Sequence, residues 1–155
     1  MAKRYRQGLY TCQHPEKYIG PDLKKIHWRS SWERHVFVFL DTHPNIKYWG
    51  SEAMQIPYFN PLKRAWVPYI PDLLVIFEDK HGKAHGVVYE IKPLSQSLME
   101  EAGRSPRNRA QVAVNMMKWK AAAEFCAKRG LRFEVLTEDK IFQNTAAEVK
   151  RRRRK

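Results

Sequence analysis

Residues 66–92 read WVPYIPDLLVIFEDKHGKAHGVVYEIK and give the strongest indication of the fold class. This stretch holds two runs rich in β-branched and aromatic residues, Trp66 to Phe77 and Ala84 to Ile91, and such residues favour strands. The polar segment between the runs, residues 78–83, contains Gly82 and suits a turn. The stretch therefore predicts a β-hairpin at the centre of a sheet.

Pairing across this hairpin brings charged residues together. If the strands are antiparallel and the turn is centred near His81, paired residue numbers add to about 162, which sets Asp72 opposite Glu90. Side chains alternate between the faces of a strand, so Glu90, Lys92 and Asp72 share one face. Their neighbours are apolar, and charges in such surroundings need a partner or a chemical task.

Two carboxylates this close provide the hard oxygen ligands that Mg²⁺ prefers, and the Ile91 carbonyl would add a third oxygen. A metal held there would polarise a phosphodiester and lower the pKa of a bound water. Lys92 would position that water and offset the charge that develops on the phosphate. The alternative is an ordinary carboxylate–lysine ion pair at the edge of a sheet.

The residues around the hairpin predict a mixed sheet flanked by helices. Ser30 and Glu33 form a capping box that begins a helix over residues 31–42. Residues 46–57 alternate roughly as strands around a turn at Gly50-Ser51, and residues 60–63 form a turn. After the hairpin, Ser105-Pro106 begins a long helix that ends at Gly130. Residues 131–136 form a strand, and a short helix begins near Thr137 or Glu138.

The length of 155 residues fits one domain, which we place at residues 1–149. Its first 27 residues lack a clear period and predict an extended arm that packs through Tyr5, Tyr10 and Tyr18. Residues 150–155, KRRRRK, form a basic tail of like charges.

Charge indicates the class of partner. Lys and Arg total 29 against 16 acidic residues, a formal net charge of +13, which favours a polyanion such as DNA. No apolar run approaches the roughly 20 residues of a membrane span, and no signal peptide begins the chain, so we expect no membrane and a cytoplasmic protein. The two cysteines predict free thiols, and the six histidines form no metal-binding spacing.

Phosphate contacts are expected from basic residues near the predicted site and at the start of the long helix: Arg29, Arg104, Arg107, Arg109 and Lys118. Gln111 and Asn115 lie one turn apart on that helix, and either could reach the site. For each of these residues the alternative is a solvated helix face.

Pro71-Asp72 and Glu90-Ile91-Lys92 resemble the PD…ExK signature of the restriction-endonuclease-like fold. The resemblance implies that Asp72 and Glu90 hold the metal and that Lys92 assists hydrolysis. Related nucleases, TnsA-like transposon endonucleases among them, carry a glutamate on the first helix, and Glu33 is the candidate for it. A purely structural capping role for Glu33 and a metal role for Glu52 remain alternatives.

A longer set of motifs resembles the head completion nucleases of T-even-type tailed phages. These motifs are Tyr5-Arg6-Gln7-Gly8, Pro15-Glu16-Lys17-Tyr18, Trp28-Arg29-Ser30-Ser31-Trp32-Glu33, Trp49-Gly50-Ser51-Glu52, Ile56-Pro57-Tyr58 and Glu90-Ile91-Lys92-Pro93. The resemblance implies a Mg²⁺-dependent endo- and exonuclease, with Mn²⁺ as a substitute metal. The resemblance also implies that the protein acts on double-stranded DNA after packaging and is needed for head–tail joining.

The same resemblance implies portal or head–tail connector proteins as partners. It also implies that the protein is in the host cytoplasm during assembly, with the virion as a second location. A homodimer is one arrangement that would allow both strands to be cut. Two rival functions stay open: a DNA-binding structural protein of the head–tail junction without essential catalysis, and a junction-resolvase or transposase-type endonuclease of the same fold.

Overall fold

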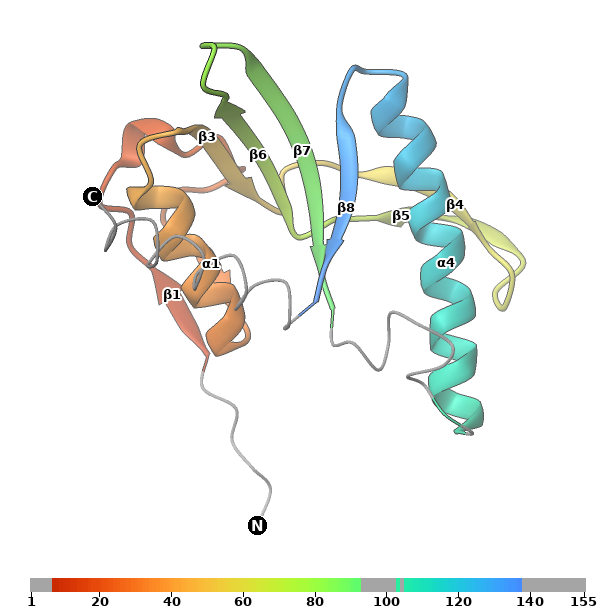
Figure 1. Cartoon of the computed structure of the whole chain (residues 1–155). Helices are drawn as coiled ribbons and strands as arrows, with labels where there is room; N and C mark the ends of the chain where they lie inside the picture. Colours follow the sequence, from red (N-terminus) through yellow and green to blue (C-terminus); the bar gives the residue numbers. More distant parts are fainter. Residues whose placement is uncertain (1–6, 93–102, 104, 138–155) are drawn as a thin grey trace.

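The computed structural model describes residues 7–92, 103 and 105–137. Its centre is a mixed four-stranded sheet in the order β3-β6-β7-β8, flanked by two helices (Figure 1). The elements are β3 (Ile46–Ser51), β6 (Leu73–Glu78), β7 (Ala84–Ile91), β8 (Arg132–Leu136), α1 (Ser31–Thr42) and α4 (Pro106–Ala127). Strand β8 is parallel to β7, and the other neighbours are antiparallel. The predicted mixed α/β fold with a central hairpin is confirmed.

The β6–β7 hairpin has the predicted register. Leu73 pairs with Tyr89 and Phe77 pairs with His85, and each pair of numbers adds to 162. One step beyond the ladder, Asp72 therefore lies across from Glu90. The backbone N–H of Ile91 donates a hydrogen bond to the Asp72 carboxylate, which fixes the two strands to each other at this end.

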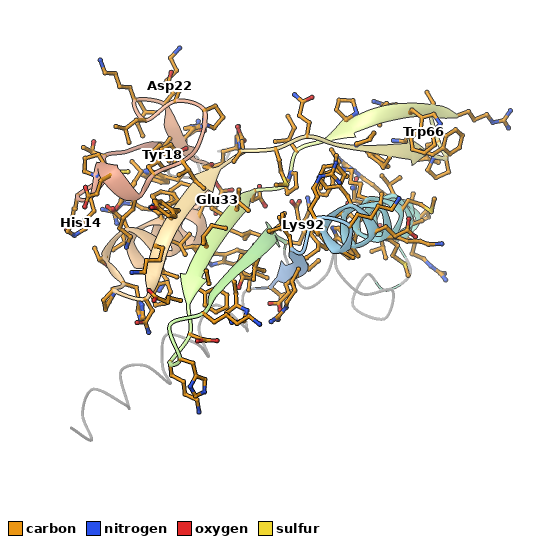
Figure 2. All side chains as sticks on the ribbon, turned by 90° about the horizontal axis from the view of Figure 1, so that it is seen from above. His14, Tyr18, Asp22, Glu33, Trp66 and Lys92 are labelled. Atoms are coloured by element: carbon orange, nitrogen blue, oxygen red, sulfur yellow. The ribbon has the colours of Figure 1, made fainter. Side chains whose placement is uncertain are left out.

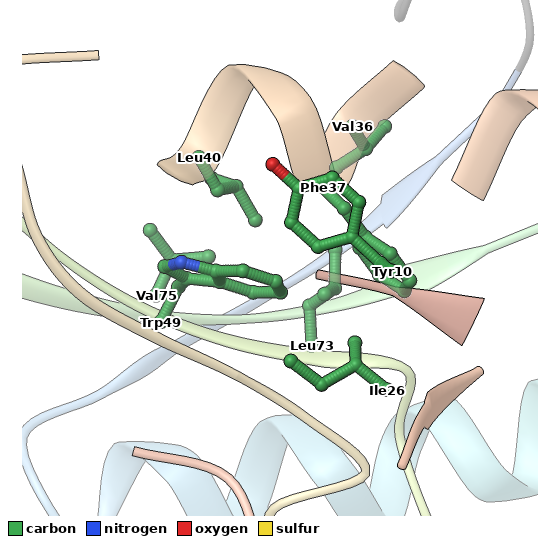
Figure 3. Close-up of a cluster of buried hydrophobic side chains, with 8 residues drawn as sticks. All are labelled: Tyr10, Ile26, Val36, Phe37, Leu40, Trp49, Leu73 and Val75. Atoms are coloured by element: carbon green, nitrogen blue, oxygen red, sulfur yellow. The ribbon is translucent and has the colours of Figure 1, made fainter. Parts of the chain in front are cut away.

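Alternation along the strands assigns each helix to one face of the sheet. Leu73 and Val75 pack with α1 in a core cluster that also takes in Tyr10 and Trp49 (Figure 3). Phe133, which pairs with Val88, packs with α4 in a second cluster. Residues of even number at this end of β7 therefore face α4, and the predicted site residues Glu90 and Lys92 are among them.

Both predicted helices are confirmed with their caps. The Ser30 hydroxyl accepts a hydrogen bond from the Glu33 N–H at 3.2 Å, and α1 begins at Ser31. The Ser105 hydroxyl accepts from the Asn108 N–H at the start of α4. Gly130, with φ +71°, follows the helix end in the left-handed conformation that glycine tolerates.

The predicted first strand of the hairpin, Trp66 to Phe77, is wrong as one element. Its first half is β5 (Ala65–Tyr69), which pairs with β4 (Ile56–Asn60) in a separate two-stranded hairpin, and only its second half joins the central sheet. Pro71 has no N–H to offer a ladder, and the chain changes direction between Tyr69 and Leu73. The apolar pattern alone did not reveal this break.

The predicted turn at Gly50-Ser51 is also misplaced. Both residues belong to β3, and the turn follows at residues 52–55. Gly50 is needed inside the strand because a Cβ there would lie 2.9 Å from the Gly20 backbone nitrogen. The predicted turn at Asn60 is confirmed: the Asn60 carboxamide oxygen accepts hydrogen bonds from the Leu62 and Lys63 N–H groups.

The N-terminal segment contains elements that the sequence did not predict. Strands β1 (Gly8–Tyr10) and β2 (Ile26–Trp28) pair with each other, with the 3-10 helix η1 (Pro15–Lys17) between them. Elements of three residues are too short to show a period. Tyr10 and Tyr18 pack against Trp49 as expected, and the Tyr10 hydroxyl donates to the fully buried Asp41. The segment is therefore part of the core and not an arm.

Several expectations fall outside the described residues: the packing of Tyr5, the helix near Glu138 and the tail at residues 150–155. Cys12 and Cys126 are both free, as predicted. No helix among the described residues is long and apolar enough to cross a membrane.

Candidate active site

Two strands, β6 and β7, bring the three predicted residues together at one end of the sheet. Asp72 directly precedes β6, Glu90 lies near the end of β7, and Lys92 follows β7. The Lys92 ammonium lies 3.4 Å from Glu90 Oε1, as expected for residues two apart on one strand face. The structure thus places Asp72, Glu90 and Lys92 side by side.

Glu90 is held from two sides. Its side chain is only 7% exposed, and its Oε2 accepts a hydrogen bond from the Tyr69 hydroxyl at 2.7 Å. Oε1 faces Lys92. Because a buried carboxylate needs partners, this arrangement keeps Glu90 in one orientation.

Asp72 is a half-buried carboxylate that lies beside a second, buried carboxylate, that of Glu90. Burial, and then the charge of Glu90, raise the pKa of Asp72 from 3.8 to about 7, although the Ile91 N–H at 2.7 Å opposes the shift. Two anions this close repel each other unless cations offset their charge, and Lys92 offsets only part of it. The pair therefore carries the negative charge that a divalent cation would offset.

The donor set fits Mg²⁺ or Mn²⁺. Two carboxylates supply hard oxygen ligands, and Mg²⁺ in nucleic-acid enzymes is typically held by one or two carboxylates, with water and phosphate completing its shell. The described residues contain no group of three or more His, Cys, Asp or Glu side chains that could hold a metal by themselves. The backbone at Ile91, whose N–H contacts Asp72, lies beside the pair.

Glu33 lies near the pair but is engaged elsewhere. Its Oε2 accepts the Arg29 N–H at 3.0 Å, so it reaches one residue further back than a standard capping box. Its charge nevertheless contributes to raising the pKa of Asp72. Glu33 therefore combines the capping role with a place in the electrostatic surroundings of the site.

Glu52 contacts the site through its backbone. Its N–H donates to the Asp72 carbonyl at 3.0 Å, and its φ of 53° is left-handed. Its carboxylate instead accepts a hydrogen bond from Arg29 Nη1 at 2.7 Å, which raises the pKa of Arg29. A phosphate contact by Arg29 would have to compete with this ion pair.

Lys118 points from α4 toward the same end of the sheet. Its ammonium lies 5.6 Å from the ring centre of Tyr69 and 5.8 Å from that of Tyr58. Burial lowers the pKa of Lys118, and the positive charge of Lys92 lowers it further. Lys118 is therefore a second cation beside the carboxylates.

The other predicted DNA contacts are not part of this group. Arg107 and Arg109 are exposed on the first turns of α4, about 17 and 14 Å along the helix from Lys118 at 1.5 Å per residue. The Gln111 side chain donates to Asn115 Oδ1 at 3.0 Å and bonds within its own helix. Arg104 lies outside the described residues.

Sequence reasoning missed Tyr69. It lies three residues before Asp72 and reaches Glu90 only because the chain bends between β5 and β6. If Trp66 to Phe77 is taken as one strand, nothing in the sequence predicts this contact. Lys118 was predicted as a phosphate contact, but its cation–π contacts with β4 and β5 were not.

Comparison with known protein families shows the class to which a chain with this fold and this carboxylate pair belongs. The TnsA-like endonuclease N-terminal family matches residues 43–138, which include β3 through β8. The chain belongs to this family and has the restriction-endonuclease-like fold.

A particular relative covers more of the chain. The head completion nuclease of Enterobacteria phage T4 is 36% identical over 141 residues, which is 85% of this chain and 91% of that protein. The similarity therefore extends beyond the nuclease family match.

Proposed function

We propose that this protein is a metal-dependent DNA nuclease that acts in the completion of phage heads. One observation carries the chemical part: the half-buried Asp72 lies beside the buried Glu90 and next to Lys92, and burial, together with the charge of Glu90, raises the pKa of Asp72 to about 7. The biological part rests on the relative named a head completion nuclease, to which this chain is 36% identical over 85% of its length.

In the proposed reaction, Asp72 and Glu90 hold Mg²⁺ or Mn²⁺, assisted by the Ile91 carbonyl and by Glu33. The metal would polarise the scissile phosphate and lower the pKa of a water molecule. Lys92, whose side chain is 23% exposed, can reach the substrate and donate to a phosphate oxygen as negative charge develops on it. Tyr69 keeps the Glu90 carboxylate in place.

Double-stranded DNA is the proposed substrate, cut internally and from its ends, and the net charge of +13 supports a polyanionic partner. Arg29, Arg104, Arg107, Arg109 and Lys118 are the proposed phosphate contacts. The proposed role in head completion predicts the host cytoplasm during assembly as its location, with the virion as a second location. Portal or connector proteins are its proposed partners, and a homodimer would allow both strands to be cut.

Plasmid cleavage tests the proposal. Wild-type protein should nick or linearise plasmid DNA with Mg²⁺ or Mn²⁺ and leave it intact with EDTA. Glu90→Gln and Lys92→Met should each lower the rate by at least about 100-fold, the usual cost of losing one group that stabilises developing charge. Circular dichroism and urea unfolding should show that both variants fold.

The chain offers a matched control on the same sheet. Lys47 and Glu78 form an ion pair at 2.7 Å on the far end of β3 and β6. Lys47→Met and Glu78→Gln make the same chemical changes there and should cut like wild type. If wild type binds DNA but never cuts it, the protein is a structural DNA-binding component of the head–tail junction. If it cuts four-way junctions in preference to linear duplex, it is a junction-resolvase type of enzyme.

A further inference from the structure

The β4–β5 hairpin extends beyond the central sheet, and α4 runs beneath it. The two strands pair only with each other. The inner face of the hairpin, with Ile56, Tyr58 and Tyr69, packs on Val114 and Ala122 of α4. Figure 2 shows Lys92 where the sheet, α4 and the base of the hairpin meet, and Trp66 far along the hairpin. The hairpin and α4 thus form one unit that begins at the candidate active site.

A lysine interrupts the apolar stripe of this unit. Lys118 lies one turn after Val114 and one turn before Ala122, both of which are buried. Its ammonium lies over the rings of Tyr58 and Tyr69, at 5.8 and 5.6 Å. Burial disfavours the charged form of a lysine, so an apolar residue at this position would serve packing alone better.

Two further lysines lie close enough to Lys118 to affect its charge. Lys92, beside Glu90, and Lys63, in the turn between β4 and β5, both lower the pKa of Lys118. Neither Lys63 nor Lys118 has an ion-pair partner among residues 7–92, 103 and 105–137. Glu90, which contacts Lys92 at 3.4 Å, and Asp72 offset part of this positive charge, and the repulsion that is left between Lys118 and Lys63 would be relieved by an external anion. The arrangement is therefore suited to a chain of negative charges.

The hairpin extends away from the candidate active site. Tyr69, which contacts Glu90, ends β5, and Lys63 lies in the turn just before the strand begins at Ala65. At about 3.3 Å per residue, β5 spans about 13 Å. One strand of DNA advances about 3.4 Å per nucleotide, so this length corresponds to about four nucleotides.

We propose that the β4–β5 hairpin and α4 form a second DNA-contacting surface, which holds the phosphates on one side of the cleavage point. Lys118 binds a phosphate next to the scissile one, Tyr58 and Tyr69 keep its ammonium in place, and Lys63 binds a phosphate up to about four nucleotides away. This inference rests on the proposed nuclease function, because it takes the position of Lys92 as the point of cleavage.

DNA binding without cleavage tests it. Fluorescence anisotropy with a labelled duplex of about 24 base pairs in EDTA gives the association constant over a range of salt concentrations. Each lost phosphate contact should lower the slope of log K against log salt by about 0.9. Lys63→Ala and Lys118→Met should each do so and weaken binding about fivefold at 0.15 M salt, and the double variant should lower the slope by about 1.8.

The control is Lys80→Ala, which removes an equal charge from the exposed turn of the β6–β7 hairpin, away from α4. It should leave the slope unchanged. If Lys63→Ala and Lys118→Met bind like Lys80→Ala while wild type binds DNA in a salt-dependent way, the second surface is refuted and the proposed nuclease stands. If wild type does not bind DNA, the proposed function itself fails.

Discussion

Placing Asp72 beside Glu90 should lower the free energy of unfolding by a measurable amount. The pKa of Asp72 is raised from 3.8 to about 7 by burial and by the Glu90 charge. A rise of about 3 pH units corresponds to about 4 kcal/mol, because each unit is about 1.4 kcal/mol. Without metal, the ionised Asp72 should therefore destabilise the folded protein by up to about 4 kcal/mol.

The sign of the pH dependence follows from the raised pKa. The folded state keeps its proton on Asp72 to higher pH than the unfolded state does. The stability that this proton provides is fully present below about pH 4, is lost as pH rises toward about 7, and is absent above it. Asp72→Asn removes the charge and keeps an oxygen that can accept the Ile91 N–H. In EDTA it should stabilise the protein by up to about 4 kcal/mol at pH 8, and by about 1 kcal/mol at pH 4.5.

Urea unfolding followed by tryptophan fluorescence at both pH values measures the difference directly. The matched control is Asp79→Asn, since hydrogen bonds from His85 and from the Lys83 N–H lower the pKa of Asp79. This control should destabilise the protein at pH 8, the opposite sign. If Asp72→Asn is no more stable than wild type at pH 8 in EDTA, Asp72 is not held ionised against Glu90 and the electrostatic reasoning is wrong.

Three other changes test separate parts of the structure. Tyr69→Phe removes the donor to Glu90 Oε2, and a lost partner of this kind should raise the Mg²⁺ concentration for half-maximal cleavage about tenfold; an unchanged metal dependence would remove Tyr69 from the site. Asp41→Ala orphans the Tyr10 hydroxyl and two backbone N–H groups and should cost about 4 kcal/mol in urea unfolding, so a loss below about 1 kcal/mol would contradict the buried network. Ser30→Ala removes the cap of α1 and should lower the free energy of unfolding by about 1 kcal/mol. An unchanged free energy of unfolding would show that other contacts hold the start of the helix.

The sequence predicted what depends on local pattern. Capping and stop residues gave the bounds of α1 and α4 to within two residues. Strict alternation around one turn gave the register of β6 and β7, and with it the meeting of Asp72 and Glu90. These features depend on residues close together in the chain, so a single sequence contains them.

The missed features depend on contacts between distant segments. Gly50 reads as a turn residue, but it lies in a strand because the backbone at Gly20 packs against it. The bend after Tyr69 follows from β5 pairing with β4 instead of continuing into β6. Lys63 and Lys118 of the second surface come from a turn and a helix, and only the folded chain brings them close to Lys92 at the end of β7.

Plasmid cleavage by Asp72→Asn in Mg²⁺ shows whether the carboxylate pair is the active site. This variant is expected to be more stable than wild type, so its inactivity could not be a failure to fold. We expect Asp72→Asn to leave the plasmid intact under conditions in which wild type and Asp79→Asn cut it. Cleavage by Asp72→Asn at the wild-type rate would show that the carboxylate pair is not the site of the chemistry.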